Sequence, residues 1–265
     1  ITQGFVCSTV GGQTSVLGRG GSDYSATLIG AAIKAKAIEI WSDTNGVLNN
    51  DPRKVTNTTT VNAISYDEAT EMAFFGAKIL HPKCLIPAKE RSIKVIVKNT
   101  FNPEFSGTVI SSKTTHTTVV KAAATKENVS ILNIKSNRTL TENEFISKTF
   151  KTLSKYQQQT DLMSITNVTI AIAIVANSQI ETCINKLSKF SSVSVLKEQS
   201  IITLVGNLSS NSSGNSDTIL KSFKKIPIKM IGYGSSNTSI SIVIDKADQN
   251  RALQNVNEYI FNLKN

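Results

Sequence analysis

The sequence has few cysteines and no long apolar run, and both shortages narrow what the protein can be. Cys7, Cys84 and Cys183 are its only cysteines, and their odd number and wide spacing fit neither a disulfide framework nor a zinc site. No apolar run reaches the roughly 20 residues that a membrane-spanning helix needs. The longest, residues 168–176, suits a buried strand. We therefore expect a soluble, globular protein of a reducing, cytoplasmic compartment, with no membrane partner.

The sequence also lacks any block of like charge, although its formal net charge is +10. Basic residues are spread along the whole chain, and aromatic residues are not interleaved with them. A nucleic-acid-binding surface concentrates its lysines and arginines on one face or stripe. We therefore expect no nucleic-acid partner.

An initiator methionine and a signal-peptide pattern are both missing from the start of the sequence. Ile1 opens directly into an apolar run, which predicts a strand over residues 1–6. Such a start is typical of the middle of a domain. We expect the chain to be a fragment, or to lack its beginning.

A glycine-rich segment, Val16-Leu-Gly-Arg-Gly-Gly-Ser-Asp-Tyr24, carries the densest chemistry in the sequence. Its two adjacent glycines allow a sharp turn, and Arg19 offers a planar fork of donors that suits a carboxylate or a phosphate. Ser22 and Asp23 follow where a helix begins, and we expect them to cap it. Together these groups suit a small zwitterion, although an ordinary strand-to-helix turn would use the same residues.

The segments that follow predict an α/β sheet with parallel strands. A helix is expected over residues 22–36, with an apolar face, and a strand over residues 37–43 that ends in Ser42 and Asp43. Strand, glycine turn, helix and strand form the repeating unit of parallel sheets, whose ligands bind beyond the carboxyl ends of the strands. Arg19–Asp23 and Ser42–Asp43 both fall near such ends, which favours a functional site.

Two further residues of this part, Arg53 and Lys78, have both a functional and an ordinary interpretation. Arg53 lies in a proline turn and is free to reach a ligand or to stand on the surface. Ser65 and Glu68 form a capping box that starts a second helix. Near the end of that helix, Lys78 could bind a phosphate or could favour the helix dipole. Another strand is expected over residues 93–97.

From about residue 119 the sequence contains a repeat. The order strand–helix–strand–strand–helix–strand is that of a ferredoxin-like unit, and finding it twice argues for duplication. The second copy lacks a final strand, and we expect residues 119–124 to complete its sheet. No acid–base pair, nucleophile or metal cluster occurs in this half, so its expected role is ligand sensing or assembly. The predicted strands are 129–135, 162–165, 168–175, 193–196, 201–205, 228–231 and 239–244, and the predicted helices are 143–157, 178–190, 216–225 and 247–262.

The sequence resembles the aspartate kinases in four motifs that occur in the family's order. These are Leu17-Gly-Arg-Gly-Gly-Ser-Asp-Tyr24, Ile40-Trp-Ser-Asp43 with Asp51-Pro-Arg53, Phe75-Gly-Ala-Lys-Ile-Leu-His-Pro82, and Val97-Lys-Asn-Thr100. The resemblance implies an amino-acid kinase fold followed by two ferredoxin-like regulatory units of the ACT type. The implied domains are the nucleotide-side part of the kinase over residues 1–118 and ACT units over residues 119–198 and 199–265.

The same resemblance implies an activity and a set of site residues. Aspartate kinases use MgATP to phosphorylate the side-chain carboxylate of L-aspartate, the first step towards lysine, threonine and methionine. ATP and Mg²⁺ are thus the implied cofactors, and no protein residue is assigned to the metal. Arg19 and Asp23 are the implied catalytic residues. By position, Arg19 would bind the aspartate α-carboxylate, Asp23 would face its amino group, and Phe5, Gly20 and Ser22 would line the same pocket; Ser42, Asp43, Arg53 and Lys78 would border the nucleotide.

The resemblance also has departures. The family's Lys-Phe-Gly-Gly-Thr motif does not precede Ile1, so we expect these 265 residues to be inactive by themselves. Phe145, Asp161 and Thr166 match positions that line an effector pocket between the ACT units of two subunits. This implies a homodimer that senses lysine or threonine. Glu144 stands where a glycine is usual, which weakens that expectation. The alternative is a non-catalytic ACT-type regulatory subunit or a decayed kinase fragment.

Overall fold

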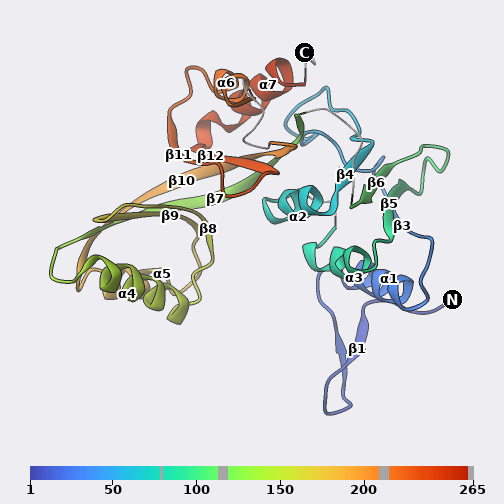
Figure 1. Cartoon of the computed structure of the whole chain (residues 1–265), viewed down its shortest axis with the longest axis horizontal. Coiled ribbons are helices and arrows are strands. Elements are labelled where there is room, and N and C mark those ends of the chain that lie inside the picture. The colour runs from blue at the N-terminus through green and yellow to red at the C-terminus, as the bar shows by residue number, and fades with distance from the viewer. Residues whose placement is uncertain (78–79, 113–118, 209–214, 262–265) are drawn as a thin grey trace.

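The computed structural model describes residues 1–77, 80–112, 119–208 and 215–261. They form a first part with helices α1–α3 and strands β1–β6, and a second part built on one large sheet (Figure 1). None of the helices in the described residues combines the length and the apolar character needed to cross a membrane.

The chain begins with a hairpin and not with the expected strand over residues 1–6. Strand β1 (Val6–Ser8) pairs antiparallel with β2 (Thr14–Val16). Residues 1–4 belong to no helix or strand. The expectation was wrong because Phe5 has a φ of 75°, which interrupts the extended backbone that its apolar neighbours favour. The hairpin projects from the rest of the molecule (Figure 1).

The expected helix and parallel strands are confirmed. Helix α1 (Gly21–Ala32) leads to β3 (Ala37–Ser42), which pairs parallel with β5 (Lys94–Asn99). An added Cβ on Gly30 would lie 2.5 Å from Ile38 Cγ1, so the glycine lets α1 pack closely on β3. The apolar face expected on α1 is only partly buried. Ala26 packs on the core, whereas Ile29 and Ile33 are 42% and 70% exposed.

Two short strands that the sequence patterns did not predict complete this sheet. They are β4 (Ala63–Ser65) and β6 (Thr108–Ser111), and the strand order is β3-β5-β6-β4. β6 runs parallel to β4 and antiparallel to β5, so the sheet is mixed. Three or four residues are too few for a recognisable alternation, which explains why these strands escaped prediction.

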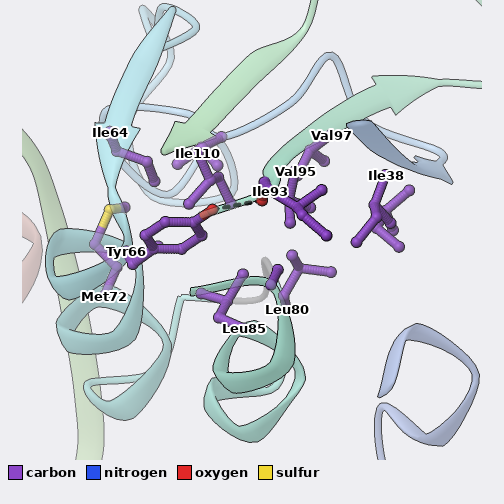
Figure 2. Packing of buried hydrophobic residues seen from close by; sticks show 14 of the residues in the cluster. Ile38, Ile64, Tyr66, Met72, Leu80, Leu85, Ile93, Val95, Val97 and Ile110 are labelled. Carbon is purple, nitrogen blue, oxygen red and sulfur yellow. Dashed lines mark hydrogen bonds between the residues drawn. The ribbon is translucent and has the colours of Figure 1, made fainter. Parts of the chain in front are cut away.

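Besides α1, three helical segments pack on the sheet. Helix α2 (Tyr66–Phe74) starts at the predicted capping box of Ser65 and Glu68, and the 3₁₀ segment η1 (Pro82–Leu85) runs into α3 (Ile86–Glu90). The Tyr66 hydroxyl donates a hydrogen bond of 2.5 Å to the Ile93 carbonyl, which satisfies a buried polar group. The core around this bond contains Ile38, Ile64, Met72, Leu80, Leu85, Val95, Val97 and Ile110 (Figure 2).

The second part is one six-stranded antiparallel sheet that both repeat units share. Its order is β11-β12-β10-β7-β9-β8. Strands β7 (Val120–Ser136) and β10 (Ser191–Gly206) pair along most of their length. Residue 198, the expected boundary between the units, lies within β10. The remaining strands are β8 (Thr160–Ile165), β9 (Thr169–Val175), β11 (Ile228–Gly232) and β12 (Ser239–Asp245).

The first half of β7 completes the sheet of the second unit, as the sequence predicted. Ala122, Ala123 and Ala124 pair with Val205, Leu204 and Thr203 of β10. At their midpoints both long strands contain a bulge, with Asn128 at φ 58° and Glu198 at φ 54°. A bulge bends the strand and changes the direction of its side chains. The two units therefore join at these bulges.

Helices cover each unit and bury separate cores. Helices α4 (Glu142–Lys155) and α5 (Ile180–Leu187) cover the first unit. The second unit carries α6 (Asn215–Ser222), the 3₁₀ segment η2 (Lys246–Asp248) and α7 (Gln249–Tyr259). Another cluster joins the two parts of the chain, because Phe75 after α2 packs with Ala124, Ile131 and Met230 of the regulatory sheet.

Candidate functional site

The glycine turn before α1 leaves the start of that helix open. Gly20 is the residue that precedes the helix, with a φ of 73°, and among the described residues no side chain caps the first turn. Ser22 and Asp23 lie within the first turn, so the expectation that they cap the helix was wrong. Their side chains follow the turn, whereas a capping residue must precede it. The Gly21 amide donates to the Gly18 carbonyl at 3.0 Å, and the positive end of the helix dipole favours an anionic ligand here.

The loop rests on the 3₁₀ segment η1. A Cβ on Gly20 would lie 2.6 Å from His81 Cβ, so only a glycine fits this approach. The Cys84 thiol donates a hydrogen bond of 3.1 Å to the Gly20 carbonyl. Burial raises the pKa of Cys84 to about 11, so this thiol stays protonated and serves as a donor. Sequence reasoning missed the support from Cys84, because no local pattern links residues 64 positions apart.

A recess of about 440 Å³ opens at this loop, lined by Phe5, Gly18, Arg19, Gly20, Gly21, Ser22 and Asp23. The five residues that the resemblance implied for substrate are thus brought together. Phe5 reaches the recess from the preceding segment, where its amide donates to Ser25 Oγ at 3.1 Å and its carbonyl accepts from the Leu17 amide at 2.8 Å. A Cβ on Gly21 would lie 2.9 Å from the Phe5 ring.

The recess contains one cation and one anion that are open to a ligand. Arg19 is exposed and Asp23 is half-buried. Within the described ranges, neither side chain takes part in an ion pair. Burial raises the pKa of the Asp23 carboxyl, because desolvation disfavours its charged form. A ligand ammonium placed here would restore the lost interactions of that carboxylate.

Ser42 and Asp43 lie at the carboxyl end of β3, beside the end of β5. The Ser42 carbonyl accepts a hydrogen bond of 2.8 Å from the Thr100 amide, and Asp43 is exposed. Gly30, late in α1, packs on Ile38 early in β3, so α1 runs back along the strand. Its open start therefore points to the same end of the sheet as Ser42 and Asp43.

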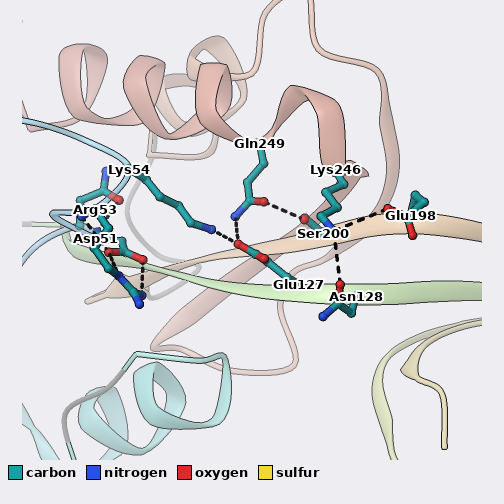
Figure 3. Close-up of polar contacts among 10 residues, drawn as sticks. Asp51, Arg53, Lys54, Glu127, Asn128, Glu198, Ser200, Lys246 and Gln249 are labelled. Atoms are coloured by element: carbon teal, nitrogen blue, oxygen red, sulfur yellow. Dashed lines mark hydrogen bonds and ion pairs between the residues drawn. The ribbon is translucent and has the colours of Figure 1, made fainter.

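Arg53 lies further along the chain, in the segment between β3 and β4. Its guanidinium binds Asp51 with two hydrogen bonds, of 2.9 and 2.7 Å (Figure 3). This contact holds the pKa of Asp51 below its ordinary value. The Arg53 side chain is 66% exposed, so a ligand can reach it. Lys78, the fourth residue expected near the nucleotide, lies outside the described residues.

The three residues matched to an effector pocket do not meet within one chain. Phe145 is fully buried in the core of the first unit, where its ring lies edge-on to that of Phe190, with 6.4 Å between the ring centroids. Asp161 is buried and paired with Lys126 at 2.6 Å. Thr166 is exposed and closes a turn with Thr169. Burial is the largest influence on Asp161 and raises its pKa, despite the opposing charge of Lys126.

Glu144, the residue in place of the usual glycine, has a structural role in α4. The Glu144 amide donates to the Thr141 hydroxyl, and the Thr141 amide donates to the Glu144 carboxylate at 3.0 Å. These bonds form a capping box. The bonds that the Thr141 amide and hydroxyl donate to the carboxylate lower the pKa of Glu144, because the charged carboxylate is the better acceptor.

Two family models match separate parts of the chain. Residues 1–99 match the model of the amino acid kinase family, and residues 202–259 match an ACT domain. The lysine-sensitive aspartokinase 3 of Escherichia coli is 31% identical over 98% of the chain, and the chloroplastic aspartokinase 1 of Arabidopsis thaliana is 33% identical over 94%. The chain is a homologue of the aspartokinases.

The structure of this aspartokinase homologue agrees with that relationship. The crystal structure of E. coli aspartokinase III in complex with aspartate and ADP superposes over 98% of the chain with a TM-score of 0.87 at 30% identity. The chain spans 60% of the length of that relative and 46% of the A. thaliana protein. The kinase fold and the ACT units that the motifs implied are therefore confirmed.

Proposed function

We propose that this aspartokinase homologue takes part in the ATP-dependent phosphorylation of the side-chain carboxylate of L-aspartate. The observation that carries the proposal is the recess at the start of α1, where Arg19 and Asp23 both lack an ion-pair partner among the described residues. Arg19 would bind the α-carboxylate of aspartate in the bidentate manner that guanidinium groups favour. Asp23 would receive the amino group, and the Gly20–Ser22 backbone would complete the pocket.

The nucleotide would lie at the carboxyl ends of β3 and β5. Ser42 and Asp43 stand there with exposed or half-buried polar groups, and Arg53 is the exposed cation that suits phosphate oxygens. Phosphoryl transfer depends mainly on positioning and charge neutralisation. To contact a phosphate, the Arg53 guanidinium would have to leave Asp51 or to bind Asp51 and the phosphate together.

Mg²⁺ is bound in such sites by one or two carboxylates together with substrate phosphates. In the part of the chain that the structure describes, no three His, Cys, Asp or Glu side chains are grouped closely enough to hold a metal ion. The donor set therefore fits an ion that arrives with the nucleotide and contacts Asp43, and not a preformed protein cage. Mg²⁺ would neutralise charge on the phosphates.

The proposal includes control by lysine through a homodimer of ACT units. One relative is named as lysine-sensitive, and the edge strand β8 exposes Met163 and Ile165 at 46% and 45%. Asp161 Oδ2 is buried and has no hydrogen-bond partner in the part of the chain that the structure describes, so a carboxylate oxygen remains for an effector ammonium. Thr166 stands at the end of the same strand. Phe145 would act through the core beneath it.

The proposed substrate site is tested by titrating L-aspartate into the chain in a calorimeter. Arg19→Lys replaces a planar fork with a point charge, and we expect at least about a tenfold loss of affinity, because a hydrogen bond to a charged group contributes about 1.5–3 kcal/mol. Arg91→Lys, an exposed change at the end of α3, is the matched control and should leave the affinity unchanged. Absence of saturable aspartate binding by the unmodified chain, or equal affinities for both variants, would refute the assignment.

Lysine control and dimer formation are tested separately. Sedimentation in the presence and absence of lysine measures the oligomeric state, and Asp161→Asn tests the effector contact. We expect a dimer that lysine stabilises and a weaker response in the variant. A monomer at all concentrations would refute this part and leave the aspartate site untouched.

A further inference from the structure

The loop that carries Arg53 is built onto the second ACT unit. In this loop, residues 49–55, the Asn49 carbonyl accepts a hydrogen bond of 2.8 Å from the amide of Ala123 in β7. Asn50 Nδ2 donates to the Leu253 carbonyl of α7 at 3.3 Å. Val55 is only 2% exposed and belongs to the core of the second unit. The position of the loop therefore depends on β7 and α7.

A polar cluster fastens the centre of the loop to the same unit (Figure 3). The Lys54 ammonium pairs with the Glu127 carboxylate of β7. Gln249, the first residue of α7, donates its Nε2 to Glu127 Oε1 at 3.2 Å. Ser200 of β10 donates to the other end of the same amide at 3.2 Å. Gln249 and Ser200 are buried, so Glu127 is held from the regulatory side by a fixed partner.

The bulge in β7 places Glu127 at this point. Asn128 adopts a φ of 58°, and β7 has one residue more than β10 between the pairs Lys126–Ile201 and Val129–Gln199. An extra residue of this kind changes the direction of a side chain relative to the regular pleat. The carboxylate of Glu127 consequently meets the loop and the start of α7.

A short path leads from Lys54 to Arg53. The amides of Lys54 and Val55 both donate to the Asp51 carbonyl at 3.0 Å, which closes the turn around Pro52. The Asp51 carboxylate then accepts the Arg53 amide and both guanidinium bonds. The ion pair of Lys54 and Glu127 thus fixes the turn, and the turn fixes the place from which Arg53 reaches outward.

We propose that Glu127 of the regulatory sheet is a positioning residue for Arg53 and through it for the phosphate groups of a nucleotide. The inference rests on the proposed function, because it takes Arg53 as a phosphate contact. It adds a route from the ACT region to the nucleotide: a shift of α7 or of the β7 bulge moves Glu127, and with it the loop. Glu127 itself touches no substrate.

The test measures two properties of the full chain with Glu127→Lys, which places two ammonium groups together. Hydrogen exchange of residues 49–55 reports the order of the loop. Quenching of Trp41, the single tryptophan of the chain, reports ADP binding beside Ser42. The matched control is Glu198→Lys on β10, which makes the same change of charge beside Lys246 of η2. Lys54→Glu combined with Glu127→Lys restores an ion pair of reversed direction.

We expect Glu127→Lys to raise the exchange rate of the loop and the Kd for ADP, each by about twofold to fivefold, the range measured for ion pairs that solvent still reaches. The Kd for L-aspartate should not change. Glu198→Lys should match the unmodified chain, and the double variant should recover most of both effects. If Glu127 only stabilised the fold, the variant would raise hydrogen exchange across the whole second unit, and it would not weaken ADP binding selectively.

The outcomes separate this inference from the proposed function. If the unmodified chain binds ADP and Glu127→Lys leaves either the loop exchange or the Kd for ADP unchanged, the positioning role is refuted and the nucleotide site stands. If the unmodified chain binds no ADP, the nucleotide part of the proposed function fails and this inference fails with it. Aspartate binding, measured in the same samples, decides the substrate site independently.

Discussion

The ion pair between Lys121 and Glu68 provides the sharpest prediction about stability. Lys121 Nζ lies 2.8 Å from Glu68 Oε2, and the two side chains are 3% and 4% exposed. The pair joins β7 to α2 and hence the regulatory sheet to the kinase part. Removing one partner of a buried pair leaves an uncompensated charge, which destabilises a protein by about 3–5 kcal/mol. Lys121→Met should therefore lower the free energy of unfolding by about that amount.

The prediction is measured by urea unfolding, followed by circular dichroism. With a urea m-value of about 2–3 kcal/mol/M, the midpoint should fall by about 1–2.5 M. The matched control is Lys89→Met on α3, because Lys89 pairs with Asp67, the neighbour of Glu68, with both side chains more than half exposed. An exposed pair contributes about 0–1 kcal/mol, so this variant should hardly shift the midpoint.

A double variant separates the buried charge from lost packing. Glu68→Gln keeps an oxygen that accepts the Ser65 amide, as Glu68 does at 2.6 Å, but removes the negative charge. Combined with Lys121→Met, it should recover most of the lost stability, since no isolated charge remains buried. Equal midpoints for Lys121→Met and Lys89→Met, or no recovery in the double variant, would refute the reasoning.

Three further predictions concern a backbone constraint and two carboxylates. Gly107→Ala should destabilise the chain by more than the roughly 1–3 kcal/mol that a left-handed backbone conformation costs, because the added Cβ would lie 2.0 Å from the Val97 carbonyl oxygen at φ 73°. Gly12→Ala, at φ 80° with no atom within 4 Å of the added Cβ, should show the cost of the conformation alone. Equal shifts of the thermal unfolding midpoint in the two variants would contradict this prediction. Burial raises the pKa of Asp23 above its ordinary value of 3.8, so on acidification the affinity for L-aspartate should begin to fall at a higher pH than that value predicts. Asp23→Asn should bind L-aspartate more weakly and should lose this pH dependence. Identical pH profiles for the variant and the unmodified chain would contradict the prediction. The hydrogen bond from Lys54 lowers the pKa of Glu127, so the ion pair should stabilise the chain at pH values above the ordinary pKa of 4.5. This stabilisation should be lost as the pH falls through the lowered pKa, and Glu127→Gln should lack this contribution to acid unfolding. An acid transition unchanged in the variant would count against the ion pair.

Local sequence patterns predicted much of the fold because each depends on residues close together in the chain. Ser65 and Glu68 are three residues apart, and their capping box forms as expected. The elements of the repeat follow from runs of alternating or periodic apolar residues, and β9 and α4 lie within a few residues of their expected bounds. The glycine turn placed Arg19 and Asp23 in one recess for the same reason.

Errors arose where a nearby contact or a conformation outweighed the local pattern. Phe5 ends the expected first strand because its backbone takes a positive φ, held by Ser25 and Leu17. The sequence also did not indicate that the Phe145 side chain fills the core of the first unit, and its match to an effector position stays a prediction.

The sequence by itself determined the kinase motifs, the two ACT units and the cluster of charged and glycine residues that opens α1, because these depend on short-range spacing. Only the tertiary structure decided that β7 and β10 run through both units, that Lys121 meets Glu68, and that the Arg53 loop rests on the second unit. Each of these contacts joins residues more than fifty positions apart. The repeat indicated that residues 119–124 complete the second unit, but no local pattern specifies the individual pairings, which follow from the packing of whole elements against one another.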